Sequence, residues 1–385
     1  MAQFIVQATL LFLSSATAVQ ISGARLSDVA IFLFALSLLA YRRREISGSH
    51  TITFFLLLIA FTIFISTEYS GLVDARGFDA GIRNAVAVPL GVFLSLLCIW
   101  LMDSEQVLRI ASSYSRVVVS VCSCFFLGQL FLGPLDWVIY ENQFDRFSAF
   151  SQNPNQLALY LAPVPFFSLI ACAKNLKGRW SAAIEIALGI AINLFVLGKA
   201  LFIGWGLSAV ILFLLGWVWF GAVHLNEVKF FGRVLLSLVL SGIFWPVIVA
   251  LYKGDAAGSQ ADQGDVRVKL WGHGFEAWTD SVFVGHGPGH YSGLEASYQN
   301  MEAHNFLIDW LSAYGLLGGI ALTFYCAWLL FYSVRCRAWL VLALYVTLLV
   351  QATFHFYGRQ PLFWILLIFG YFIASSSTAS RRISY

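Results

Sequence analysis

Residues 265–319 read DVRVKLWGHGFEAWTDSVFVGHGPGHYSGLEASYQNMEAHNFLIDWLSAYGLLGG, and this stretch decides how the rest of the chain is interpreted. It is the one long polar interval among runs of apolar residues, and it ends at His304 and Asn305, directly before a new apolar run. A loop of this length between helices is usually either functional or disordered. We expect this one to carry the function of the protein.

The composition is that of a membrane protein. Of the 385 residues, 59% are hydrophobic and 11% are charged, whereas soluble domains carry about 25% charged residues. Aromatic residues make up 16% of the chain, which suits a lipid-facing surface with interfacial belts. The net charge of +3 is too small to indicate a nucleic-acid partner. The low share of charged residues and the high share of hydrophobic residues therefore exclude a water-soluble fold.

Apolar runs predict the helices, because a spanning helix needs about 20 mostly apolar residues. About twelve such runs occur, so we expect an all-α integral membrane protein with one polytopic domain, 1–385, and a large loop, 254–305, between the ninth and tenth spans. The first run could instead be a signal peptide, but no Lys or Arg precedes it. The runs lie near 4–20, 26–41, 51–67, 84–102, 115–135, 154–173, 181–198, 201–220, 234–252, 306–332, 338–354 and 361–376.

The basic residues indicate the topology. If the N-terminus is cytoplasmic, most of the 23 Lys and Arg fall into short cytoplasmic loops, as the positive-inside rule requires. This inside set includes Arg109, Arg116, Lys174 and Lys177. Both termini are then cytoplasmic, and the 254–305 loop faces the periplasm or the outside.

Four cations approach the outer side: Arg83, Arg146, Lys199 and Arg267. Arginine matches phosphate oxygens with two parallel hydrogen bonds, so together they could hold a diphosphate. Each one alone is also explained by a side chain that reaches lipid headgroups. Lys199 lies at the short junction between two apolar runs, where we expect a polar cleft because a lysine facing hydrocarbon is costly.

The long loop divides into three parts. A helix over 266–280 would lie along the membrane interface. GHGPGH, residues 285–290, predicts a tight turn rather than a metal site, since Gly-Pro-Gly prevents the helix that would align His286 with His290. No metal or cofactor is predicted. The helix would carry Lys269, His273, Glu276 and Asp280 on one face and Arg267, Trp271, Phe275 and Trp278 on the other.

His304 is the candidate catalytic residue of the third part. Histidine titrates near neutral pH and can take a proton from an attacking hydroxyl. The alternative is a histidine that only anchors the span. Asn305 could orient the ring or bind a hydroxyl. Counting helical phase puts Asp309 away from His304, so we do not pair these two residues.

These residues resemble the O-antigen ligase and polymerase family of bacterial membrane proteins. The ligase signature is His, then Asn, Ser or Gln, nine residues, Gly, two residues, and Gly, Thr or Tyr, which His304, Asn305, Gly315 and Gly318 match. The family often has Ser-Arg-Gly where this chain has Gly198-Lys199-Ala200, and lysine lacks the bidentate fork. Other segments that resemble the family are Arg267 with Trp271, Val284 to Gly289, Arg146-Phe147-Ser148 and Asn153-Pro154-Asn155.

The resemblance implies a glycosyltransferase C-type fold in the bacterial inner membrane, with the active face in the periplasm. It implies metal-independent, inverting transfer of a polyprenyl-diphosphate-linked glycan to a hydroxyl of a glycan or lipid A core. His304 would be the general base, supported by Asn305. The diphosphate would be held by Arg267, Arg146, Arg83 and Lys199.

Other functions remain open at this point. An O-antigen or exopolysaccharide polymerase of the same family is one alternative. A lipid-linked glycan flippase or another transporter is a second, although transporters usually place their charges at the midplane and show repeated halves. The expected partners are the glycan donor, its acceptor, membrane lipids and other polysaccharide-assembly membrane proteins.

Overall fold

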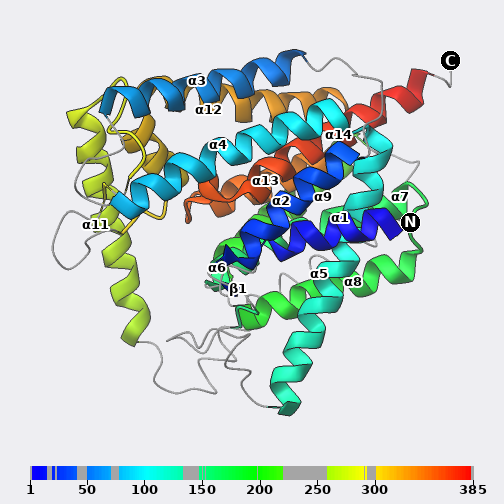
Figure 1. Ribbon diagram of the computed structural model, residues 1–385. Helices are drawn as coiled ribbons and strands as arrows, with labels where there is room; N and C mark the ends of the chain where they lie inside the picture. Colours follow the sequence, from blue (N-terminus) through cyan, green and yellow to red (C-terminus); the bar gives the residue numbers. More distant parts are fainter. Residues whose placement is uncertain are drawn as a thin grey trace.

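The protein is a bundle of helices (Figure 1). The computed structural model describes residues 2–14, 20–21, 24–40, 50–70, 78–132, 147–149, 151, 153–196, 198–219, 258–289, 291–292 and 301–382. Within them the predicted all-helical class is confirmed, with one small addition. This is an antiparallel pair of two-residue strands, β1 (Gln20–Ile21) and β2 (Ala24–Arg25).

The helices follow the predicted apolar runs, except that the run at 234–252 lies outside the described residues. The first part of the chain forms α1 (Ala2–Leu13), α2 (Leu26–Ala40), α3 (His50–Ser70), α4 (Phe78–Leu101) and α5 (Ser104–Leu132). The middle forms α6 (Pro154–Leu161), α7 (Val164–Ala173), α8 (Arg179–Val196) and α9 (Lys199–Trp219). The last part forms α11 (Gly258–Asp280), α12 (Phe306–Arg335), α13 (Trp339–Ala352), the short 3-10 helix η2 (Tyr357–Arg359) and α14 (Pro361–Arg382).

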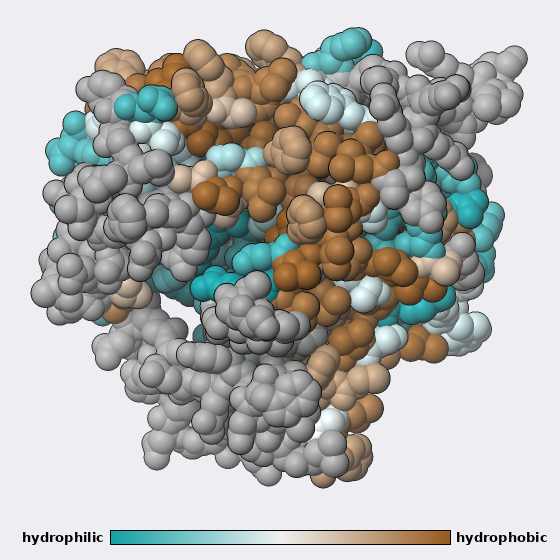
Figure 2. All heavy atoms as spheres, in the orientation of Figure 1, coloured by the Kyte–Doolittle hydropathy of each residue, from teal (hydrophilic) through white to brown (hydrophobic). Residues whose placement is uncertain are grey.

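Several helices are suited to a bilayer. Within the described residues, five are long and apolar enough to cross a membrane, and six apolar helices of 10–17 residues accompany them. A broad hydrophobic band covers the face seen in Figure 2. The protein is therefore an α-helical membrane protein, while the number of twelve spans stays a prediction. The five are His50–Glu68, Ser104–Gly128, Pro154–Ala173, Arg179–Val196 and Phe306–Arg335.

The two ends of the bundle differ. Figure 1 shows α11 lying across the ends of the other helices, together with the turn 281–289, the start of α12 and the loop 353–360 between α13 and α14. We call this the cap end. The opposite end, where α1 begins, α14 ends and the loop 174–178 joins α7 to α8, we call the terminal end.

Trp364 of α14 organises the packing below the cap end. It is fully buried, and its ring contacts Trp310 of α12 with centroids 5.8 Å apart. Its indole Nε1 donates a hydrogen bond to the carbonyl of Gly358, 2.6 Å away, in η2. A side chain at Gly91 of α4 would overlap the same indole. The loop 353–360 is thus fixed to the helical core beneath it.

Two of the cations that were predicted to lie in short loops lie within a helix instead. Arg109 and Arg116 lie within α5, which begins at Ser104, because the polar first turns of this helix lower its hydropathy without breaking it. Lys177 lies in a loop, as predicted, but its side chain is fully buried and paired with Glu185 of α8. Burial lowers the pKa of Lys177, and the Glu185 carboxylate opposes that shift.

Candidate functional site

His304 is held in an unusual backbone conformation just before α12. Its φ is 55°, in the left-handed region. Such a conformation costs a non-glycine residue on the order of 1–3 kcal/mol and persists only where the surroundings impose it. The helix begins after it, because the Asn305 side-chain oxygen caps α12 by accepting from the N–H groups of Leu307 (3.1 Å) and Ile308 (3.2 Å). Asn305 therefore has a structural role in setting where His304 lies.

Asp309 imposes that conformation. Its buried carboxylate accepts one hydrogen bond from the N–H of Ala303 (2.8 Å) and another from the N–H of Asn305 (3.2 Å), the residues on either side of His304. A helical count does not apply to His304, because this residue precedes the helix that contains Asp309. Asp309 acts on the backbone around His304.

A buried ion pair joins this segment to the loop 353–360. The Arg359 guanidinium donates to the Glu302 carboxylate. The Glu302 side chain is 6% exposed and that of Arg359 is 24% exposed. Removing one partner of such a pair is costly because the other charge stays buried. The pair therefore fixes the spacing between the segment before α12 and the loop.

Two aromatic residues of the same loop complete this region. The ring of His355 lies 6.3 Å from the ring of His304, centroid to centroid, at an interplanar angle of 72°. The ring of His355 also contacts the ring of Tyr357, with centroids 5.5 Å apart. The Tyr357 hydroxyl donates to the carbonyl of Asn155 (3.0 Å), at the start of α6. His304, the loop and α6 thus meet at the cap end.

The predicted glycine turn is confirmed, and it packs into a break in α12. Gly315 has φ 60° and ψ −164°, which interrupts the helix. A Cβ there would overlap the Phe283 carbonyl, and one at Gly285, whose φ is +69°, would lie 2.5 Å from the Ala313 carbonyl. Four backbone hydrogen bonds join residues 282–287 to residues 312–317. They run from His286 N to Ser312 O (2.9 Å), Gly287 N to Ala313 O (2.8 Å), Leu316 N to Val282 O (2.7 Å) and Leu317 N to Phe283 O (3.1 Å).

The helix predicted over 266–280 is confirmed within α11, and the structure adds a third face to the two that were predicted. Leu270, Gly274 and Ala277 are buried, whereas Phe275 is 53% exposed. A Cβ at Gly274 would lie 2.6 Å from the Ile308 side chain of α12. The small residues therefore let α11 approach the helix that follows His304.

Of the four predicted diphosphate ligands, the structure describes the side chains of two. Arg267 is half-buried on α11, and burial lowers the pKa of its guanidinium, which stays charged at physiological pH. Lys199 is exposed at the start of α9. Arg83 lies within α4, but its side chain is outside the described part of the chain, as is all of Arg146. The residue after Arg146, Phe147, donates its N–H to Phe195 O (3.0 Å) near the α8–α9 junction.

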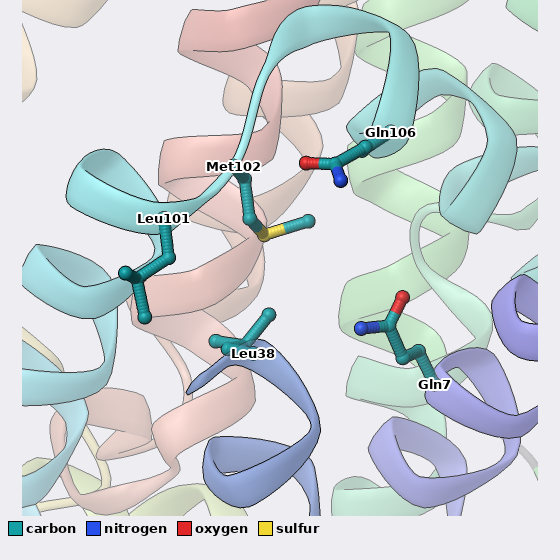
Figure 3. Close-up of a pocket in the computed structure, with 5 residues that line it drawn as sticks. All are labelled: Gln7, Leu38, Leu101, Met102 and Gln106. Carbon is teal, nitrogen blue, oxygen red and sulfur yellow. The ribbon is translucent and has the colours of Figure 1, made fainter. Parts of the chain in front are cut away.

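Figure 2 shows a hollow toward the cap end, with hydrophilic residues on its visible floor. A separate hollow, drawn in Figure 3, lies at the terminal end. Its polar groups are used within the protein, since Gln7 Nε2 donates to Ser37 Oγ (3.3 Å) and Gln106 Oε1 accepts from Asp103 N (3.1 Å). The lining residues are Gln7, Leu38, Leu101, Met102 and Gln106.

Among the described residues, no three His, Cys, Asp or Glu side chains lie together so as to hold a metal ion. Comparison of the chain with models of known protein families finds no match, and comparison with curated proteins finds none either. The resemblance to the O-antigen ligase family therefore stays a prediction from the sequence.

Four residues of this region were not predicted as site residues: Glu302, Asp309, His355 and Tyr357. The sequence does contain one indication of Glu302 and Asp309, because two carboxylates close to His304 are unusual in a chain with few charges. For His355 and Tyr357 the sequence offers no signal, since only folding brings their loop to His304.

Proposed function

We propose that this protein is a membrane glycosyltransferase of the O-antigen ligase type, which moves a polyprenyl-diphosphate-linked glycan onto an acceptor hydroxyl. The observation that carries the proposal is His304, held in a strained conformation at one end of an apolar bundle by Asp309 and Asn305. Strained residues that their surroundings over-determine cluster at active sites. A lipid-linked substrate would also require a reactive group near the end of membrane helices.

In the proposed reaction, His304 takes the proton of the acceptor hydroxyl. The hydroxyl oxygen forms a bond to the anomeric carbon from the face opposite the diphosphate, and the bond to the diphosphate oxygen breaks, so the configuration inverts. The leaving diphosphate gains negative charge. Arg267 and Lys199, together with Arg83 and Arg146, would stabilise that charge. No metal takes part in this scheme.

The finer architecture belongs to the same proposal. It comprises twelve spans of the glycosyltransferase C type in the bacterial inner membrane, with both termini cytoplasmic and the cap end in the periplasm. The positive-inside distribution and the position of α11, opposite the start of α1 and the end of α14, support this orientation. A polymerase would use the same chemistry with a lipid-linked repeat unit as acceptor.

The test is His304→Ala in the producing cells, with the glycan products analysed by size and attachment. We expect a loss of transfer of about 10²–10⁴-fold, the usual contribution of a general base. Accumulation of lipid-linked polymer would identify a ligase, and accumulation of single repeat units a polymerase. The matched control is His50→Ala, an exposed histidine at the start of α3. Normal glycan length and attachment in His304→Ala would overturn the proposal.

A further inference from the structure

We infer that His355 is a second substrate-contacting residue, which holds the acceptor hydroxyl against His304. This inference rests on the proposed function, because it names the group that grips the acceptor in that reaction. The observation behind it is that the two imidazoles lie edge to face, with centroids 6.3 Å apart and an interplanar angle of 72°, although they come from different segments.

The separation of the rings suits one oxygen atom between them. Hydrogen bonds of about 2.7–3.2 Å allow a single oxygen to reach a nitrogen of each ring at this distance. Both side chains are half-buried, so they are neither packed in the core nor fully in solvent. Partial burial of this kind shields the two rings from bulk water without enclosing them in the core.

The chemistry of the two groups is complementary. A neutral imidazole has one nitrogen that donates and one that accepts, and a hydroxyl can do both at once. The acceptor hydroxyl would donate to His304 and accept from the N–H of His355. When the oxygen attacks the anomeric carbon, its proton passes to His304, and the bond from His355 holds the oxygen in line.

Three contacts anchor the loop 353–360 and so give His355 a fixed position. Tyr357 bonds to α6 through Asn155, Arg359 pairs with Glu302, and Gly358 accepts from Trp364 of α14. A Cβ at Gly358 would lie 2.6 Å from the Phe306 ring, so the loop packs closely on the first residue of α12. A rigid loop of this kind preorganises a binding group.

The experiment compares two variants that separate hydrogen bonding from packing. His355→Phe keeps a ring against Tyr357 but cannot donate, whereas His355→Gln keeps a donor without the ring. The purified protein is assayed in detergent, with lipid-linked glycan extracted from the producing cells as donor. The acceptor is their lipid A core or, for a polymerase, the lipid-linked repeat unit. Thermal unfolding of each variant establishes that it is folded.

We expect His355→Phe to raise the KM for the acceptor about tenfold, the usual effect of one lost hydrogen bond. Its KM for the donor should stay within about twofold, and His355→Gln should restore most of the acceptor affinity. His304→Ala, in the same assay, should lose turnover instead.

Two results would overturn the inference. One is an unchanged acceptor KM in folded His355→Phe. The other is an acceptor KM preserved by Phe and lost with Gln, which would show that the ring only packs. The proposed function fails separately, if His304→Ala retains full transfer, so the two failures are distinguishable.

Discussion

Each end of the bundle holds an ion pair, and the two pairs differ in burial and in what surrounds them. At the terminal end, Lys177 pairs with Glu185, and their side chains are 0% and 7% exposed. Lys177 Nζ also donates to Ser112 O (3.1 Å), and Ser168 Oγ donates to Glu185 (2.7 Å). The pair is thus saturated by protein groups from α5, α7 and α8.

At the cap end, the Arg359 side chain remains 24% exposed while its partner Glu302 is buried. The half-buried rings of His304 and His355 lie on the two segments that this pair joins. Ion pairs therefore serve two different purposes in this protein. A saturated pair fastens helices to each other, whereas an incompletely buried pair positions the two loop segments that carry His304 and His355.

The strongest way to break the cap end is Gly315→Ala. The new Cβ would overlap the Phe283 carbonyl and would stand in a backbone region that is essentially restricted to glycine. We expect the free energy of unfolding to fall by about 5 kcal/mol, near the upper limit for one substitution. Thermal unfolding in detergent measures this loss.

Gly272→Ala is the matched control, because no atom lies within 4 Å of a Cβ built there. It should leave stability nearly unchanged. Equal stability of the Gly315 and Gly272 variants would contradict the docking of the turn into the break in α12.

Lys177→Met and Arg359→Met remove the cation from each of the two ion pairs. Lys177→Met leaves the buried Glu185 with only the half-exposed Arg116 as a counter-charge, 3.7 Å away, and we expect it to cost about 3 kcal/mol. Arg359→Met should cost less, about 2 kcal/mol, because water already reaches this pair. Denaturant or thermal unfolding of both variants gives the difference, and a larger loss at Arg359 would invert the proposed contrast.

Asp309→Asn tests the conformation of His304 with the smallest change. An amide retains one acceptor oxygen but turns its NH₂ toward the second backbone N–H, so one of the two hydrogen bonds is lost. We expect a loss of about 1–2 kcal/mol in stability together with reduced transfer. The control is Asp280→Asn, an exposed carboxylate at the end of α11. Full transfer by a folded Asp309→Asn would show that His304 does not need this support.

Much of the architecture was predictable from local patterns. The apolar runs located the helices, and GHGPGH located the turn, because glycine permits the positive φ values at Gly285 and Gly287. The start of α5 was placed too late, since hydropathy does not register a helix whose first turns are polar. The packing face of α11 was not identified, because small residues give no strong hydrophobic signal.

The candidate site was predictable only in part. His304 and Asn305 stand out by their position before an apolar run, but the left-handed backbone of His304 depends on Asp309, which a helical count separates from it. The partners His355, Tyr357 and Arg359 could not be found in this way. Their contacts join segments that are distant in the chain, and such contacts leave no periodic pattern.

By itself, the sequence determined that the protein is built from membrane helices and that glycines break or turn the chain at particular positions. The reason is local: backbone polar groups in a bilayer must be satisfied within a helix, and some backbone conformations exclude a side chain. Only the tertiary structure decided which loops meet at the cap end. That choice follows from packing, ion pairing and hydrogen bonding between distant residues, above all Glu302 with Arg359 and Tyr357 with Asn155.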